Sequence, residues 1–406
     1  MNDVTIAGAG AAASFLALRA LQLKLQPTIL RALLPAVGGI EIIPASAWRL
    51  LDALGLGELL AGLGAGLGDG LTRRLADGTV DARDGRSLHV ERLKLREALL
   101  KEAGRRGARI FDIDRLPRLD PDAYAVDATG QRAAWSRPVV RRGRESADIF
   151  FAAEAVIPPG TGALALLDRG WAYLASDRTS ATVGVVGRCA STSSPLEPQV
   201  LRALGLADGA PFRHVGRRAA FVQWAARPIL GRRLAIGDAA VHHNPIGGRG
   251  LAFALGSAFA AAAVLATWRD DPGVEKATQS YYESYVAAEV RRHLAFLGGE
   301  QPSPAVTPAL PKHVRWVPPG VEGAVMVNGR LVPGEVVTHV NGQQARWLGR
   351  LDLARLQEVT LGGQSSASVI AHLCTQGLCP ADARSALIWA LERGVIAPTD
   401  RTTARP

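Results

Sequence analysis

The chain is poor in cysteine, with only Cys189, Cys374 and Cys379 among its 406 residues. So few cysteines, and an odd number of them, do not make a disulfide framework, which indicates a reducing compartment. No CxxC pair is present, and we predict no metal site. The N-terminus lacks the basic region, apolar run and cleavage site of a secretory signal. Together these absences predict a cytoplasmic protein.

Long apolar runs are also scarce. The uncharged stretch Leu251–Trp268 has 18 residues, which is near the lower limit for crossing a membrane. It is rich in alanine and follows a glycine-rich loop, so we predict a buried core helix and no membrane span. Charged residues make up 21% of the chain and hydrophobic ones 48%, which excludes intrinsic disorder for most of it.

Lysine is rare, because only five of the 47 basic residues are lysine and the rest are arginine. The net charge is +10, and between Gln131 and Arg233 there are 15 Arg and no Lys against seven acidic residues. This concentration predicts an acidic partner or substrate, or simply a solvated arginine-rich surface. No nucleic-acid recognition motif accompanies it, so no nucleic-acid partner is expected.

The N-terminal residues have the pattern of a strand, a tight turn, a helix and a second strand. Val4–Ala7 is apolar, Gly8–Ala13 reads GAGAAA, and Ser14–Leu25 has apolar residues at helical spacing. Pro27–Leu30 is the second predicted strand. The pattern indicates a βαβ unit that begins with a glycine-rich turn.

The GAGAAA turn fits the dinucleotide-binding spacing G-x-G-x-x-G/A. Gly8 would permit the tight turn, Gly10 would let a pyrophosphate approach the backbone, and Ala13 would keep the helix close to the strand. Free N–H groups at the helix N-terminus favour such an anion. The acidic residue expected at the end of the second strand is replaced by Arg31, which we predict to contact ribose or a phosphate.

A second motif makes the resemblance more specific. The chain reads LAIGDAA over 234–240 and PIGGRG over 245–250, and an alanine-rich helix follows. This resembles the flavin-contacting signature of FAD-dependent monooxygenases and the related flavin-dependent halogenases. The resemblance implies FAD, with Asp238 on the ribityl chain and the helix N-terminus directed at the flavin. It assigns these cofactor-binding residues in the second motif: Gly237, Asp238, Pro245, Gly247, Gly248 and Gly250.

Further matches lie between the two motifs in the order of the family. GIEIIPAS over 39–46 resembles a Gly-Glu-Ser-Leu-Pro-Pro-Ser stretch, and it places Glu41 near the cofactor. HVER over 89–92 resembles the segment with an FAD-contacting Arg, which would be Arg92. DATG over 127–130 is also a family sequence. The resemblance covers about residues 1–300.

Candidate catalytic and substrate residues follow from their places in these motifs. His242 and His243 lie between Asp238 and Pro245, and an imidazole titrates in the range that proton transfer needs. They are candidate acid/base residues, or else packing residues. Arg249 is a further catalytic candidate that would meet an anionic group. Trp171 and Trp224 are candidates to line the substrate cavity, or else structural core residues.

Halogenation is disfavoured by two departures from the halogenase pattern. Halogenases of this fold carry a Trp-x-Trp-x-Ile-Pro stretch, and here 171–176 reads WAYLAS with only Trp171 preserved. They also use a lysine to capture hypohalous acid, and no Lys occurs from residue 25 to 93. Arg73 and Arg74 lie in that segment, but a delocalised, protonated guanidinium does not serve this purpose.

The expected fold is α/β, with a glutathione-reductase-like Rossmann FAD domain interrupted by a β-rich substrate domain. The FAD domain would comprise 1–130 and 226–300, and the substrate domain 131–225. The proline-rich segment 301–320 is predicted to be a linker. The remainder, 321–406, would form a small α+β domain that loosely resembles winged-helix peptide-binding modules. A dimerisation or lid domain is the alternative for this last part.

The resemblance implies a monooxygenase that uses O2 and electrons from NADH, NADPH or a partner reductase. Within the halogenase-like branch, some flavoproteins oxidise a Trp side chain in a partner protein during tryptophylquinone biogenesis, as in the maturation of quinohaemoprotein amine dehydrogenase. An acidic protein or peptide substrate would suit the basic middle region, so aromatic hydroxylation of a protein-borne Trp is the leading hypothesis. Small-molecule aromatic hydroxylation, halogenation and a non-catalytic flavin-fold binding protein are the alternatives.

Overall fold

The structure is a computed structural model. It describes residues 3–33, 38–74, 80–118, 120, 122–153, 157–168, 170–187, 196–297, 310–317, 320–338, 344–348, 351–392 and 394–399. The chain divides into two compact units, 1–262 and 263–406. The predicted four-part division, with its discontinuous FAD domain, stays a prediction.

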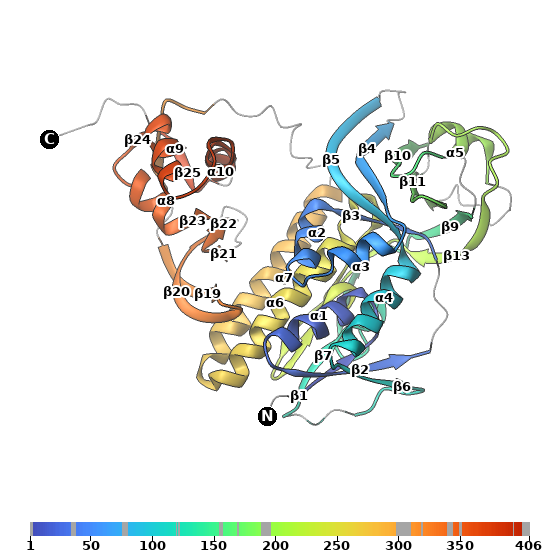
Figure 1. The fold of residues 1–406 in the computed structure, drawn as a ribbon, viewed down its shortest axis with the longest axis horizontal. Coiled ribbons are helices and arrows are strands. Elements are labelled where there is room, and N and C mark those ends of the chain that lie inside the picture. Colours follow the sequence, from blue (N-terminus) through green and yellow to red (C-terminus); the bar gives the residue numbers. More distant parts are fainter. Residues whose placement is uncertain are drawn as a thin grey trace. The chain divides into compact units, whose positions relative to one another are not determined.

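A six-stranded sheet in the first unit carries the predicted βαβ pattern (Figure 1). Its order is β15-β16-β7-β1-β2-β6, and every pair is parallel except the β15–β16 hairpin. Both faces are covered, since Ile6 and Ala7, which point to opposite faces of the central strand, are fully buried. The strands are β1 (Asp3–Ala7), β2 (Gln26–Ala32), β6 (Arg109–Ile113), β7 (Tyr124–Asp127), β15 (Ile229–Leu230) and β16 (Arg233–Ala235).

Two helices of the first unit pack beside each other next to this sheet. They are α1 (Ala11–Gln22), which joins β1 to β2, and α4 (Arg92–Arg105) (Figure 1). Most of α1 is apolar and buried, whereas α4 buries only one face, formed by Leu95, Leu99, Leu100 and Ala103. The predicted helix from Ser14 is therefore present, and α1 begins three residues earlier than its apolar spacing indicated.

An eight-stranded sheet in the same unit has the order β13-β9-β12-β11-β10-β4-β5-β3. Three of its strands come from residues 40–91, which the sequence analysis assigned to the FAD domain. They join this sheet because β4 pairs with β10, a strand far away in the chain. The strands are β3 (Ile40–Pro44), β4 (Gly66–Arg74), β5 (Val80–Glu91), β9 (Ser146–Ala152), β10 (Gly162–Leu167), β11 (Gly170–Ser176), β12 (Ala181–Gly187) and β13 (Arg213–Ala219).

A third, three-stranded sheet has the order β17-β14-β8 and leads into the candidate site. Its strands are β8 (Val139–Arg142), β14 (Val222–Ala225) and β17 (Val241–His242). The remaining helices of this unit are short except for the last. They are α2 (Ala45–Asp52), α3 (Gly57–Gly62), α5 (Pro198–Ala203), the one-turn η1 (Gly130–Arg132), η2 (Gly237–Ala239) and η3 (Pro245–Gly247), and the start of α6 (Gly250–Asp270).

The long helix α6 contains the apolar stretch that the sequence singled out. By length and composition it could cross a membrane, but 72% of its apolar window is buried inside the protein. Ala258 and the residues from Ala261 to Ala266 have at most 1% of their surface exposed. This burial is typical of a core helix.

The second unit contains the end of α6, the long helix α7, and a core of its own formed by α8, α9, α10 and several short strands. The predicted linker 301–320 includes a strand, β18 (His313–Trp316), which pairs with β24 and β25, and residues 301–309 lie outside the described part. The elements are η4 (Pro272–Val274), α7 (Glu275–Leu297), β19 (Gly320–Val327), β20 (Arg330–Thr338), β21 (Gln344–Ala345), β22 (Trp347–Leu348), β23 (Leu351–Asp352), α8 (Leu353–Thr360), β24 (Gln364–Ser365), α9 (Ser366–Thr375), α10 (Pro380–Glu392) and β25 (Ile396–Pro398).

The end of α4 is held by a charged pair that gives a pH-dependent prediction. Glu102 accepts hydrogen bonds from Arg105 and Arg106, and these contacts lower its pKa to about 2. The folded pKa lies below the usual 4.5, so the stabilisation is present above that pH and is lost as the pH falls toward 2. Glu102→Gln should lower the free energy of unfolding by ~0.5–1 kcal/mol at pH 7.

Urea unfolding of the Glu102→Gln variant at pH 7 and at stepped lower pH tests this, with the exposed Glu97→Gln on the same helix as the control. The difference in the free energy of unfolding between Glu102→Gln and the parent protein should narrow as the pH falls below 4.5. If both variants lost the same free energy of unfolding at every pH, the contacts of Glu102 with the two arginines would have no such role.

Candidate cofactor and active site

The loop that follows β7 packs over the turn between β1 and α1. Gly8 has φ of +108°, and a Cβ atom there would lie 2.2 Å from the carbonyl oxygen of Ala128. Gly10 precedes α1 without a side-chain cap, and a Cβ there would meet none of the described residues within 4 Å, its chain neighbours aside. The protein's own packing thus requires the first glycine. The second leaves open space at a helix N-terminus, as a pyrophosphate needs.

Other residues around this turn have defined contacts. Ala13 is fully buried in the first turns of α1. Arg96 of α4 donates a hydrogen bond from Nε to the carbonyl oxygen of Ala9 at 3.0 Å and so supports the turn. Arg31, at the end of β2, makes a two-pronged ion pair with Asp112 on β6, with N–O distances of 2.5 and 2.8 Å. A carboxylate therefore lies beside the position where the family places its ribose-binding acid.

The loop after β16 brings the second motif onto the first. Gly237 has φ of +55°, and a Cβ there would lie 3.1 Å from the Cβ atom of Ala12 on α1. Its N–H donates to Oγ of Ser257 on α6 at 2.9 Å. Since Ala12 lies in the first turn of α1, Asp238 is held next to the open helix N-terminus.

The remaining glycines of the second motif lie in a tight turn before α6. Asn244 accepts from the N–H of Ile246 at 3.1 Å and donates to the carbonyl oxygen of Ala220 at 2.6 Å, which fixes the turn that includes Pro245 and Gly247. Gly248 has φ of +58°, and at Gly248 or Gly250 a Cβ would meet none of the described residues within 4 Å. This turn also leaves room for a ligand against its backbone.

A group of charged side chains lies where these loops meet the eight-stranded sheet. We call Glu41, Arg92, Tyr173, Arg218 and Asp238 the charged cluster. Arg92, at the start of α4, forms an ion pair with Glu41 of β3, and the charges of the other members act on both. Arg92 and Asp238 each leave 43% of their side-chain surface exposed. The cluster therefore faces a space that a ligand can fill.

The cluster shifts the pKa values of its members in directions set by burial and neighbouring charge. Burial and the charge of Arg92 lower the pKa of Arg218 to about 10. Burial opposes ionisation of Asp238, but contacts with His242, His243 and Arg92 outweigh it and lower its pKa. Burial raises the pKa of Tyr173, which keeps its phenol neutral. Two guanidiniums, two carboxylates and one neutral phenol thus share the site.

The two predicted histidines have different surroundings. Nδ1 of His242 lies 3.3 Å from Oδ2 of Asp238, and both nitrogens of the ring are buried without a hydrogen-bond partner among the described residues. His243 is 5% exposed, and its ring lies 5.2 Å from that of Phe253. Arg249 is exposed at the start of α6. Of these three candidates, His242 directly contacts the carboxylate of the flavin motif.

The two candidate substrate tryptophans lie in different sheets. Trp171 of β11 is 7% exposed and packs in an apolar group that includes Ile246 of the turn before α6. Its ring centroid lies 5.9 Å from that of Tyr173. Trp224 is half-buried on β14, opposite Val241 and Val140. Trp171 thus lies beside the charged cluster, and Trp224 lies in the three-stranded sheet.

Three residues of the site were missed from the sequence. Tyr173 occupies the position of the second Trp in the halogenase stretch, and Gly184 on β12 makes room for it, since a Cβ there would lie 2.0 Å from the tyrosine ring. Arg218 could not be distinguished in the sequence from the many other arginines of this region. Arg96 supports Ala9 through a backbone contact that leaves no sequence signal. Among the described residues, no group of three His, Cys, Asp or Glu side chains could hold a metal ion.

Comparisons with known proteins identify the fold. No protein-family model and no curated protein sequence matches the chain. One similar solved structure is the flavin-dependent halogenase CmlS, at 17% identity and a TM-score of 0.75, with 98% of this chain and 96% of that one covered. Another is the peptidyl tryptophan dihydroxylase QhpG, at 19% identity and a TM-score of 0.64, with 96% of this chain and 99% of that one covered. The flavin-dependent brominase Bmp2 is also similar, at 17% identity and a TM-score of 0.61, with 75% of this chain and 90% of that one covered. The chain therefore has the mixed α/β fold of FAD-dependent halogenases and flavoprotein monooxygenases.

The two glycines of the first turn give a matched pair of variants. Gly8→Ala should lower the free energy of unfolding by ~1–3 kcal/mol, because the new Cβ meets Ala128 at a strained φ. Gly10→Ala should leave the unfolding temperature of the cofactor-free protein nearly unchanged, because its Cβ enters open space, and should weaken FAD binding.

Thermal unfolding without FAD and fluorescence titration with FAD separate the two effects. If Gly10→Ala bound FAD as tightly as the parent protein, the cofactor would not approach the backbone at this turn.

Proposed function

We propose that the protein is an FAD-dependent monooxygenase that hydroxylates an aromatic group, with the Trp side chain of a partner protein or peptide as its substrate. The observation that carries the proposal is the meeting of both flavin motifs at one open helix N-terminus, beside the charged cluster. QhpG, a peptidyl tryptophan dihydroxylase of similar fold, supports the substrate class.

The residues of the site fit a flavin dinucleotide. The uncapped start of α1 and the open space at Gly10 would hold the pyrophosphate, and Asp238 would accept hydrogen bonds from the ribityl hydroxyls. The ion pair of Arg31 with Asp112 would lie at the ribose end. When bound, FAD supplies the activation of O2, with electrons from NADH, NADPH or a partner reductase.

The chain's own contribution is to position the reactants and to handle a proton. Nδ1 of His242 faces the carboxylate of Asp238 at 3.3 Å, and neither ring nitrogen has a hydrogen-bond partner among the described residues, so the ring can exchange a proton with a bound group. Tyr173 remains neutral and can donate a hydrogen bond. Trp171 and Ile246 provide an apolar wall that excludes water.

The charge distribution supports an acidic macromolecular substrate. The concentration of arginine over 131–233 suits an acidic partner. Hydroxylation of a small aromatic molecule would not need it.

Halogenation is the second candidate, and the similarity to CmlS favours it. Against it, the charged cluster contains arginine and no lysine. Lys94, on the same helix as Arg92, is exposed and pairs with Glu91 at 2.9 Å. A guanidinium does not provide the amine that capture of hypohalous acid requires.

His242 gives a direct test of the proton-handling role. His242→Gln should lower turnover by about 100-fold while FAD stays bound, because the ring that exchanges the proton is lost. Steady-state rates and the flavin absorbance of the purified variant give both readouts. His372→Gln, which changes an exposed side chain of α9, is the control. Unchanged turnover in both His242→Gln and His243→Gln would remove these residues from the mechanism.

The proposed reaction is tested with the purified protein after reconstitution with FAD. We expect a flavin spectrum that bleaches with anaerobic NADH or NADPH, or with an added flavin reductase. In air, an acidic peptide with one Trp should gain one or two oxygen atoms, located on that residue by mass spectrometry. A halogenated product in chloride or bromide would favour the second candidate, and failure to bind FAD would contradict both.

A further inference from the structure

The three-stranded sheet carries a row of polar side chains that ends at His242. Gln223 of the central strand β14 is paired with Arg141 of β8 on one side and with His242 of β17 on the other. Side chains directly opposite each other in a sheet share one face, so these three stand on the same face. The candidate Trp224 belongs to the next row, which points to the opposite face, and is therefore turned away from His242.

A fourth side chain, that of Phe221, joins this row just before β14 begins. Its ring centroid lies 5.4 Å from that of His242, and the two ring planes meet at 69°, which is an edge-to-face contact. The Cζ atom of Arg141 lies over the same phenyl ring, 4.3 Å from its centroid, as in a cation–π contact. Phe221 is half-buried and Arg141 is exposed. The phenyl ring thus connects an exposed guanidinium with the imidazole of the candidate site.

The guanidinium of Arg141 is held in place by Gln223. Its Nε and Nη2 atoms donate hydrogen bonds to Oε1 of Gln223, at 3.3 and 2.9 Å. Gln223 is 1% exposed, and its Nε2 donates to the carbonyl oxygen of Gln131 at 2.7 Å. Both ends of this buried amide are therefore occupied, and the amide fixes the guanidinium over the phenyl ring.

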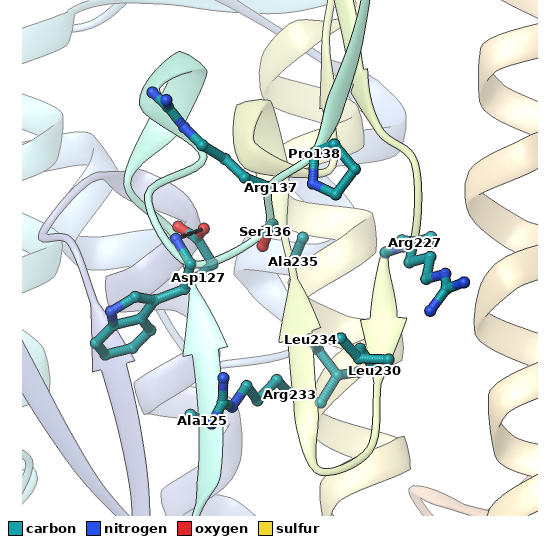
Figure 2. A pocket seen from close by; sticks show the side chains of 12 residues that line it. Ala125, Asp127, Ser136, Arg137, Pro138, Arg227, Leu230, Arg233, Leu234 and Ala235 are labelled. Atoms are coloured by element: carbon teal, nitrogen blue, oxygen red, sulfur yellow. Dashed lines mark hydrogen bonds between the residues drawn. The ribbon is translucent and has the colours of Figure 1, made fainter. Parts of the chain in front are cut away.

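The loop that carries Gln131 is itself fixed at the end of β7. Asp127 is 2% exposed and accepts hydrogen bonds from the N–H and hydroxyl of Thr129 and from the N–H of Trp135, at 3.0, 2.6 and 2.7 Å. Figure 2 shows Asp127 at the end of β7 and Pro138 where the same loop enters β8. The row that ends at His242 is thus tied to the six-stranded sheet.

His242 itself has few contacts that fix the direction of its ring. Nδ1 faces Oδ2 of Asp238 at 3.3 Å, and neither ring nitrogen has a hydrogen-bond partner among the described residues. An imidazole without such hydrogen bonds keeps one orientation only if neighbouring groups pack against it. The phenyl ring of Phe221 packs against it in this way.

We infer that Phe221, held by Arg141, is a positioning residue that keeps the ring of His242 directed at Asp238 and at the open side of the charged cluster. This inference rests on the proposed function, in which His242 handles a proton. The phenyl ring takes no part in the proton transfer itself. Without it the imidazole would turn away from the bound group, and a misplaced group of this kind slows the reaction without weakening the binding of the reactants.

The test is a double-mutant cycle in the FAD-reconstituted protein. Phe221→Leu should lower kcat by about tenfold and leave the KM for the Trp peptide and the bound FAD unchanged, whereas Phe221→Tyr, which keeps the ring, should retain the parent kcat. In the His242→Gln background, Phe221→Leu should cause no further loss, because the residue that it positions is gone. Arg141→Ala should also lower kcat. Arg142→Ala removes the same charge from the opposite face of β8 and is the matched control.

A second readout needs no turnover. Diethylpyrocarbonate modifies imidazole nitrogens, and both nitrogens of His242 are buried. In the resting FAD-reconstituted protein, peptide mass spectrometry should show faster modification of His242 in Phe221→Leu and in Arg141→Ala than in the parent protein or in Arg142→Ala. Because Arg141 is exposed, its variant provides this readout even if Phe221→Leu does not fold.

Three results would overturn the inference. The first is an equal loss of kcat on Phe221→Leu in the parent protein and in the His242→Gln background. The second is modification of His242 at the parent rate in both Phe221→Leu and Arg141→Ala, and the third is the same effect in Arg142→Ala as in Arg141→Ala. If the protein hydroxylates no aromatic substrate, the proposed function fails, and the modification rates alone decide whether Phe221 and Arg141 hold the ring.

Discussion

The fold depends on the close approach of two backbone turns to the first turn of α1. The loop after β7 lies over Gly8, where even one added carbon atom would collide with Ala128, and the loop after β16 lies against Ala12 at Gly237. Both contacts are possible only where side chains are absent. They hold residues from three distant parts of the chain around one uncapped helix N-terminus, and every other feature of the candidate site is placed relative to it.

The same packing brings the residues of the charged cluster together, at an electrostatic cost. Two arginines share a confined space with two carboxylates, and the lowered pKa of Arg218 reflects burial and repulsion from Arg92. Such an arrangement is costly unless each charge has a partner or a solvated ligand opposite it. Arg92 has Glu41, and Asp238 has His242. The open surfaces of Arg92 and Asp238 mark the side of the cluster that a bound molecule would complete.

Much of the fold and part of the site could be predicted from the sequence. Local signals predicted β1, α1, β2 and the two glycine-rich turns, because turn chemistry and helical spacing are properties of neighbouring residues. Strand pairing is not local, so residues 40–91 were not expected in the eight-stranded sheet, and the prolines near 310 hid β18. Tyr173 and Arg218 became visible only when β11 and β13 placed them beside Arg92.

The parallel pairing of β16 with β7 has a consequence for how the molecule is made. Arg233–Ala235 joins the sheet next to Ala125–Asp127, more than a hundred residues earlier in the chain, with most of the eight-stranded sheet formed between them. Non-local pairings of this kind slow folding, because the entropy cost of closing the long intervening loop comes before the stabilising contacts. Asp238 and His242 follow that strand directly, so the nascent chain acquires this loop only after both β7 and the intervening strands of the eight-stranded sheet have been made. Flavin that is present during synthesis could bind only from that point on.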